Sequence, residues 1–279
     1  MNLLWLGDPK SFDAGLVGGK AANLSRLARM YHRVPDGFSL PVTVMGEVHP
    51  LDLRNEITTA ISDLMACHSL PDFIAAVRSS AVDEDGATAS FAGQHETYLN
   101  VVGADAIIQA VTHCWESARS EHALDYRRQQ GLSVERPQIA VLVQQLVAAD
   151  VAAVVFSANP ITGNHDEVMI NASWGLGESI VGGTVTPDTF IVRKSDMAVI
   201  QRVIADKQRM TVSATGGTHE VEVPRFLRNA ASLNDEQVLE MAKLALTLEV
   251  TMKHPVDVEC AYAGGELYLL QCRPITTLK

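Results

Sequence analysis

The C-terminal stretch VDVECAYAGGELYLLQCRP, residues 256–274, constrains the fold of this chain most. Two apolar runs flank a Gly-Gly dipeptide, which is typical of a β-hairpin with a two-residue turn. Residues two apart in a strand share a face, so Asp257 and Glu259 point to the same side of the first strand. Gln271 and Arg273 are related in the same way on the second strand. Polar groups gathered in an apolar hairpin are costly to bury and require partners.

Two interpretations of this hairpin remain open. The acids and the amide supply oxygen ligands that suit Mg²⁺, with a guanidinium beside them to neutralise phosphate. Alternatively, Asp257, Glu259 and Arg273 form a structural ion-pair cluster. A strict two-residue turn places Glu259 and Gln271 on opposite faces, whereas an odd-length loop or a β-bulge places Glu259 opposite Gln271 and Asp257 opposite Arg273. The cation hypothesis requires the second register.

Charge and composition exclude several classes of protein. The net charge of −11 and the pI near 5.2 argue against binding to nucleic acid, whose partners carry basic surfaces. The first residues lack a basic lead, and no apolar run is long enough to cross a bilayer, so we expect a cytoplasmic protein without a membrane partner. The four cysteines show no C-x-x-C spacing and are predicted to be reduced core thiols.

Hydrophobic periodicity predicts a mixture of helices and strands without a regular βαβ rhythm, which indicates an α+β fold. We expect one domain, 1–279, made of two lobes that share a cleft, roughly 1–135 and 136–279. The predicted elements are helices at 18–31, 51–68, 105–130 and from Asn234 to about Met252, and strands at 73–79, 97–102, 139–147 paired with 151–157, 167–173, a hairpin within 188–204, and the C-terminal hairpin.

Four residues of the first half are candidates for a ligand site. Lys20 follows two glycines at a predicted helix start, where a cation is unfavourable unless an anion lies nearby; the alternative is a solvated lysine. Arg78 ends an apolar strand and needs a carboxylate or phosphate partner, the alternative being an acid at 83–85. The loop that follows contains Gly93, whose backbone could approach a phosphate. Gln144 lies in VLVQQLV, where a satisfied core amide is the alternative.

His219, in TGGTHE, invites assignment as a phosphate-accepting histidine. The pattern instead predicts an exposed residue in a turn before the strand EVEVP. No elbow motif supports Ser-His-Asp catalysis, and no histidine pair has the spacing of a zinc site. We therefore expect no catalytic role for His219.

Eight segments in order give the chain a family resemblance. GGKAANLSRL, VPDGF, VRSSAVDEDGATASFAGQHETYLNV, VQQLV, FSANPITG, NASWGLGESIVGG, EVEVP and PVDVE…LYLLQCRPITTL are similar to the nucleotide-binding domain of phosphoenolpyruvate synthase, pyruvate phosphate dikinase and rifampicin phosphotransferase. This resemblance covers nearly the whole chain. It implies an ATP-grasp-like fold in which two α+β lobes close on ATP and Mg²⁺.

The resemblance also implies roles for individual residues. The implied catalytic cations, which hold the phosphates, are Lys20, Arg78 and Arg273. The implied metal ligands are Glu259 and Gln271, with Asp257 in support. The remaining implied nucleotide contacts are Gly93, Thr97 and Gln144. These assignments agree with the residue-level argument, because phosphoryl transfer depends mainly on positioning and charge neutralisation.

The implied reaction is phosphoryl or pyrophosphoryl transfer of the kinase or dikinase type. Larger relatives pass the group to a histidine on a separate swivelling domain, whereas this sequence ends at RPITTLK. We therefore expect a stand-alone domain acting on a separate histidine carrier or on a small molecule. The alternatives are a non-catalytic ATP-binding or regulatory module and an excised domain of a longer enzyme. Cys260 stands where relatives usually carry tryptophan, but no proposed ligand is lost.

Overall fold

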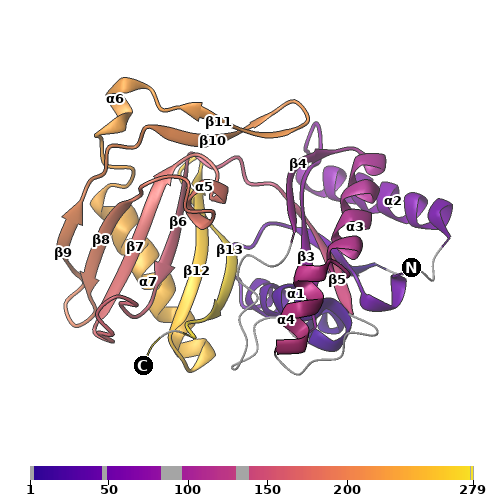
Figure 1. Cartoon of the computed structure of the whole chain (residues 1–279), viewed down its shortest axis with the longest axis horizontal. Helices are drawn as coiled ribbons and strands as arrows, with labels where there is room; N and C mark the ends of the chain where they lie inside the picture. The colour runs from indigo at the N-terminus through magenta and orange to yellow at the C-terminus, as the bar shows by residue number, and fades with distance from the viewer. Residues whose placement is uncertain (1–2, 46–48, 83–95, 130–137, 277, 279) are drawn as a thin grey trace. The chain divides into compact units, whose positions relative to one another are not determined.

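The computed structural model describes residues 3–45, 49–82, 96–129, 138–276 and 278 (Figure 1). The chain divides into two compact units. Unit 1 comprises Met1–Leu146 with Thr215–Gly217, and unit 2 comprises Val147–Ala214 with Thr218–Lys279. Each unit contains helices and an antiparallel sheet, so the predicted α+β class is confirmed.

The sheet of unit 1 has the strand order β1-β2-β5-β3-β4. Its strands are β1 (Leu4–Trp5), β2 (Gly37–Leu40), β3 (Ile74–Ala81), β4 (Thr97–Val102) and β5 (Ile139–Gln145). One face packs on α2 (Pro50–His68) and α3 (Ala104–Ser117) through a core that includes Val77 and Val143. Ser80, three residues after Val77, meets α1 (Ala14–Arg29) instead, so α1 covers the opposite face.

Two predicted features of this region are wrong. Strands β5 and β6 (Val151–Phe156) do not pair: β5 lies between β2 and β3, and β6 lies in the other sheet. The main segment of unit 1 ends at Leu146, between these two strands. The predicted helix at 105–130 is also divided, because α3 ends at Ser117 and α4 (Glu121–Gln129) starts afresh after Ser120, whose hydroxyl accepts the Ala123 N–H at its N-terminus.

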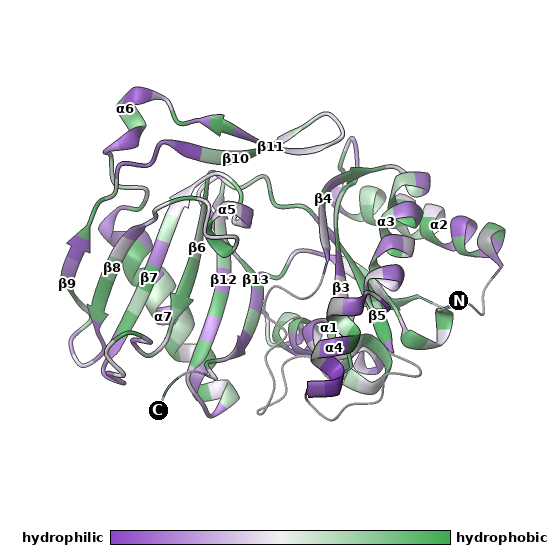
Figure 2. Cartoon of the chain, viewed as in Figure 1, coloured by the Kyte–Doolittle hydropathy of each residue, from purple (hydrophilic) through white to green (hydrophobic). Residues whose placement is uncertain are grey.

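The sheet of unit 2 has the order β13-β12-β6-β7-β8-β9 and is antiparallel throughout. The further strands are β7 (Glu167–Trp174), β8 (Asp188–Arg193), β9 (Ala198–Val203), β12 (Val256–Ala263) and β13 (Glu266–Pro274). Figure 2 shows that hydrophobic residues dominate the central strands β6, β7 and β8. They form the core under α7 (Asp235–Met252), whose predicted start is confirmed by a capping box between Asn234 and Gln237.

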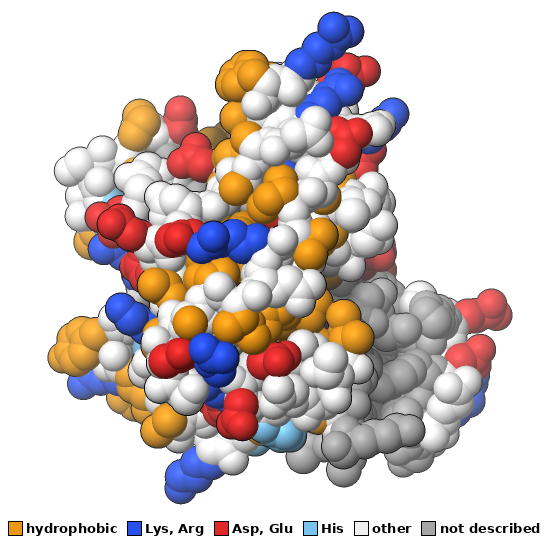
Figure 3. Space-filling view, turned by 90° about the vertical axis from the view of Figure 1, so that its left-hand side faces the viewer, with side chains coloured by type: hydrophobic (Ala, Val, Ile, Leu, Met, Phe, Trp, Pro, Cys, Tyr) orange, Lys and Arg blue, Asp and Glu red, His pale blue; other side chains and the backbone are white. Residues whose placement is uncertain are grey.

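Strand β9 forms one edge of this sheet and is partly apolar. Ile200 and Val203 are among its exposed side chains, and Figure 3, which views the molecule from this edge, shows hydrophobic side chains interspersed with charged ones. The register with β8 shifts at Ile200, and Arg202 makes an exposed ion pair with Asp235. Bulges and charges of this kind discourage pairing with another strand edge.

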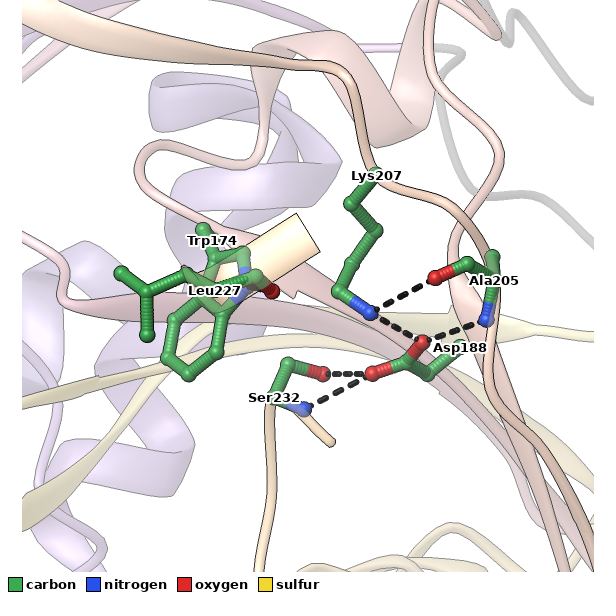
Figure 4. A network of polar contacts seen from close by, with 6 residues as sticks. All are labelled: Trp174, Asp188, Ala205, Lys207, Leu227 and Ser232. Atoms are coloured by element: carbon green, nitrogen blue, oxygen red, sulfur yellow. Dashed lines mark hydrogen bonds and ion pairs between the residues drawn. The ribbon is translucent and has the colours of Figure 1, made fainter. Parts of the chain in front are cut away.

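Between β9 and α7 the chain forms a two-stranded sheet and a short helix, joined by connecting loops. These are β10 (Arg209–Ala214), β11 (Gly217–Glu222) and α6 (Arg225–Arg228). A fully buried ion pair holds this part to the sheet (Figure 4). Lys207 Nζ donates to Asp188 Oδ1 at 2.6 Å, and Asp188 Oδ2 accepts from the Ser232 N–H and hydroxyl at 2.7 and 2.8 Å. The cluster joins the first residue of β8 to both ends of the connecting part.

Candidate nucleotide and metal site

The register of the β12–β13 hairpin places the polar residues in two facing pairs. Asp257 lies opposite Arg273, and Glu259 lies opposite Gln271. The register then shifts, because Cys260 pairs with Leu269 and leaves Leu270 as the extra residue of a bulge. This is the arrangement that the cation hypothesis requires, and it cannot arise from a strict two-residue turn alone.

All four side chains lie on the face of the unit 2 sheet opposite α7. The Tyr262 hydroxyl donates to the Glu240 carboxylate on α7, so the even-numbered residues of β12 face that helix. Because strand side chains alternate, Asp257 and Glu259 face the other side, and their cross-strand partners do the same. Short helix α5 (Glu178–Val181) contacts β6 and β7, and the preceding Gly177 lies against Ala152 on this same face.

Asp257 and Arg273 form an ion pair that engages only one carboxylate oxygen. Arg273 Nε donates to Asp257 Oδ2 at 2.8 Å, and a terminal guanidinium nitrogen lies 2.8 Å from the same oxygen. Asp257 Oδ1 is buried and has no hydrogen-bond partner among the residues that the structure describes. Burial raises the pKa of Asp257, with Arg273 acting in the opposite direction. The ion pair proposed as the alternative is therefore present, yet it leaves one buried carboxylate oxygen without a hydrogen-bond partner among the described residues.

The oxygen donors of the hairpin fit a hard divalent cation. Glu259 is half-buried, Gln271 is 5% exposed, and the facing pair that they form neighbours the Asp257–Arg273 pair on the same face of the hairpin. In the described parts of the chain no group of three or more His, Cys, Asp or Glu side chains could hold a metal. Two carboxylates and an amide form an incomplete shell of the kind that Mg²⁺ completes with water and substrate phosphates. The donors thus suit a cation that arrives with a phosphate ligand.

Lys20 is buried in unit 1 by a local distortion of α1. Gly18 has φ 77° and ψ 165°, so the helix restarts at the predicted Gly-Gly-Lys segment. A Cβ at Gly18 would lie 2.1 Å from the Ser80 carbonyl oxygen, so only glycine allows this approach. Lys20 is 5% exposed, and its Nζ donates to the Ser79 carbonyl at 3.0 Å. The alternative of a solvated first-turn lysine is therefore wrong.

Arg78, Thr97 and Gln144 share the face of the unit 1 sheet that α1 covers. Arg78 lies opposite Thr97 on β4, and Ala76, two residues before it, lies opposite Gln144 on β5. Directly opposed residues of antiparallel strands point to the same side, as does Ser80, which accepts the Ala21 N–H of α1 at 3.2 Å. Unit 1 therefore brings these three candidates to the helix that carries Lys20.

Gln144 satisfies part of its hydrogen-bonding capacity within the protein. It is 3% exposed, and its Nε2 donates to the Pro35 carbonyl at 3.0 Å, as the core-amide alternative requires. Gly93 lies outside the described residues. The acids at 83–85, the alternative partners of Arg78, also lie outside them. His219 is exposed, as predicted, although it lies within β11 rather than in the turn before it.

One polar residue on the face of the unit 2 sheet opposite α7 was not predicted from the sequence as a site residue. Asn171 lies in the middle of β7 on the side opposite α7, in line with Glu259 across β6. The available signal was an asparagine inside the apolar segment EVMINAS, since asparagine is depleted in strands.

The family model of the pyruvate phosphate dikinase AMP/ATP-binding domain matches residues 42–279. The chain belongs to this family. It is 44% identical over 231 residues to a probable phosphoenolpyruvate synthase of Methanocaldococcus jannaschii, covering 82% of this chain and 19% of that protein. A rifampicin phosphotransferase of Streptomyces sviceus is 36% identical over 300 residues, covering 94% and 34%. The chain thus spans less than half the length of these relatives.

A D-alanine–D-alanine ligase from Bacillus anthracis complexed with ATP resembles the structure weakly. The TM-score is 0.40 at 10% identity, over 96% of this chain and 57% of that one. A likeness of this size carries no argument, so the ATP-grasp-like part of the predicted fold stays a prediction, while the α+β class is seen directly in the elements of the two units. No helix in the described part of the chain is long and apolar enough to cross a membrane.

Proposed function

We propose that this chain binds Mg·ATP and takes part in phosphoryl or pyrophosphoryl transfer. The observation that carries the proposal is the bulged register of the hairpin, which aligns Glu259 with Gln271 and Asp257 with Arg273 on a sheet face away from α7. Membership of an AMP/ATP-binding family, and relatives that include phosphotransferases, support it.

The proposed roles follow from charge and position. Glu259 and Gln271 would hold Mg²⁺, supported by the unpaired Oδ1 of Asp257, and Arg273 would contact the transferring phosphates. Lys20 and Arg78 would supply further positive charge to the nucleotide, whose remaining contacts in this proposal are Gly93, Thr97 and Gln144. Mg²⁺, when bound, would neutralise charge on the phosphate oxygens.

Burial gives these cations their effect. Lys20 is almost fully enclosed, and Arg273 is partly shielded beside an acid whose pKa burial has raised. In such surroundings charges interact more strongly than in water, and a fixed cation needs little reorganisation as charge develops on a phosphate. We propose that the acceptor is a histidine on a separate carrier protein or a small molecule.

The lengths of the relatives favour a second candidate. The chain matches under half of each of them, so the complete transfer activity of those relatives involves regions outside the match. A domain that only binds ATP is therefore the alternative function. Product analysis separates the two functions. AMP indicates pyrophosphoryl or dikinase-type transfer and ADP a simple kinase, while tight binding without any product supports the binding module.

The direct test uses Glu259→Gln, with Glu236→Gln on the exposed first turn of α7 as the matched control. Mg·ATP binding is measured by titration calorimetry, and turnover is followed with γ- and β-labelled ATP with and without candidate carriers. We expect the first variant to lose Mg·ATP binding and the control to retain it. Wild-type protein that binds no nucleotide, or a Glu259→Gln variant that binds as well as wild type, would refute the proposal.

A further inference from the structure

A row of side chains extends across the unit 2 sheet from the acidic hairpin. Glu259 lies opposite Val154 on β6, Val154 lies opposite Asn171 on β7, and Asn171 lies opposite Thr189 on β8. Each of these pairs points to the same side of the sheet, and Glu259 faces away from α7. Asn171 and Thr189 therefore share one row and one face with the proposed metal ligands.

This row is more accessible than the rows beside it. All four members are half-buried. In the row on one side, Phe156 is half-buried, but Asp257, Met169 and Ile191 are only 7%, 6% and 5% exposed. In the row on the other side, Ala152 and Ser173 are 1% and 0% exposed. The accessible strip on this face consequently runs from an acid at one end to an amide and a hydroxyl at the other.

The Asn171 amide is oriented within this strip. The Thr189 hydroxyl donates to Asn171 Oδ1 at 2.9 Å, and in the described part of the chain Thr189 is the one hydrogen-bond partner of the Asn171 side chain. With its oxygen engaged, the amide presents Nδ2 as a donor. A strand-centre asparagine costs stability, which favours a ligand-binding role over a packing role at this position.

Thr189 is itself held in place from the other face of the sheet. Its neighbour Asp188 points toward α7, where the fully buried Lys207 and Ser232 bind both carboxylate oxygens (Figure 4). This cluster fixes the beginning of β8 and, with it, the backbone from which the Thr189 hydroxyl projects. Asn171 is therefore oriented by a residue on a rigid strand end.

Neighbouring strands lie about 4.8 Å apart, so the backbones at Glu259 and Asn171, two strands apart, are separated by about 10 Å. Only the small Val154 side chain stands between them in the row. Side chains from both ends, together with a cation and its phosphate ligand, can bridge this separation. A phosphate bound to Mg²⁺ at Glu259 thus comes within reach of the Asn171 amide.

We propose that Asn171 binds the nucleotide directly, donating from Nδ2 to an oxygen of the β- or γ-phosphate, and that Thr189 is the positioning residue that orients its amide. This inference rests on the proposed function, since it assigns a further phosphate contact to the same site. The hydrogen bond joins a neutral donor to a charged acceptor, the stronger class of such bonds.

The test compares the affinity of the protein for Mg·AMP-PNP and for AMP, which lacks the β- and γ-phosphates. For Asn171→Leu we expect at least about a tenfold loss of Mg·AMP-PNP affinity and an almost unchanged affinity for AMP. Asn171→Asp should lose more, because a carboxylate repels the phosphates. Thr189→Val should lose about threefold, since the amide remains but is no longer oriented.

The matched control is Gln201→Leu, which removes an exposed amide from β9 on the same face, opposite Ile191. It should leave both affinities unchanged. Equal affinities for wild type and Asn171→Leu overturn the inference. An equal loss of affinity for both ligands, or a collapse of the melting temperature of Asn171→Leu, also overturns it, because either result shows a structural role for Asn171. If wild type itself fails to bind Mg·AMP-PNP, the proposed function fails as well. If Glu259→Gln abolishes binding while Asn171→Leu binds as wild type does, only the role of Asn171 is refuted.

Discussion

Asp188 and Asp257 are buried aspartates of unit 2 that each pair with a basic side chain, and they differ in how completely the acid is satisfied. Asp188 accepts hydrogen bonds at both oxygens, from Lys207, from the Ala205 N–H and from Ser232. Asp257 accepts at Oδ2 alone, from Arg273, while its buried Oδ1 has no hydrogen-bond partner among the described residues. Both acids begin or nearly begin a strand of the same sheet.

The contrast separates a structural pair from a candidate ligand site. A buried charge is tolerated when every lone pair is engaged, and the Asp188 cluster meets that condition without any ligand. The Asp257 pair does not meet it, and it lies next to Glu259 and Gln271 on the face of the sheet opposite α7. The Asp257 Oδ1 atom, which lacks a hydrogen-bond partner among the described residues, therefore distinguishes the Asp257 pair from the Asp188 pair.

The largest effect is expected from breaking the saturated pair. Lys207→Met leaves Asp188 buried without its cation and should lower the free energy of unfolding by about 3–5 kcal/mol. Chemical denaturation measures this change. Arg202→Met, which breaks the exposed pair with Asp235, is the control and should cost less than about 1 kcal/mol. Equal losses for the two variants would remove the distinction between the pairs.

Arg273→Ala should act mainly on nucleotide handling. Removal of a phosphate-binding cation typically costs about 2–4 kcal/mol of transition-state stabilisation, and Lys20→Ala should have a comparable effect. The loss of folding stability should be smaller than for Lys207→Met, because Asp257 already has a raised pKa and can protonate when its partner is removed. Turnover of labelled ATP and melting temperatures measure the two quantities. A melting temperature that collapses in Arg273→Ala would identify this pair as structural too.

The smallest effect concerns pH. Burial raises the pKa of Asp257 in the folded protein, so ionisation of this carboxyl opposes folding. Its contribution to stability is therefore complete below the pKa of the unfolded chain and is lost as pH rises through the folded pKa. Relative to Asp257→Asn, wild type should lose unfolding free energy as pH rises above about 4, the ordinary pKa of an aspartate, as denaturation at several pH values measures. A gain over this range would show that the attraction of Arg273 outweighs the burial of Asp257.

Local signals predicted the elements that local interactions stabilise. The Asn234 capping box starts α7 where the sequence indicated, because both of its hydrogen bonds join residues three apart. The Gly-Gly-Lys segment marks a helix start, because Gly18 adopts a backbone conformation that other residues rarely reach. The break between α3 and α4 went unpredicted, since continuous helical periodicity concealed the cap at Ser120.

Strand partners and register required the tertiary structure. The apolar runs of β5 and β6 follow each other closely in sequence and resemble a hairpin, yet each is buried by a different sheet. Nothing in an apolar run specifies which of several strand edges it will meet.

By itself, the sequence determined the kinds of element, the acidic character of the protein, its family and the identity of the polar residues in the hairpin. Tertiary structure alone decided that Leu270 bulges, so that Glu259 meets Gln271, that Lys20 is enclosed, and that Asn171 and Thr189 continue the same row. The reason is that periodicity assigns a side chain to one of two faces of its own strand. A shift of one residue in pairing, which depends on contacts between distant segments, decides which side chains meet across strands.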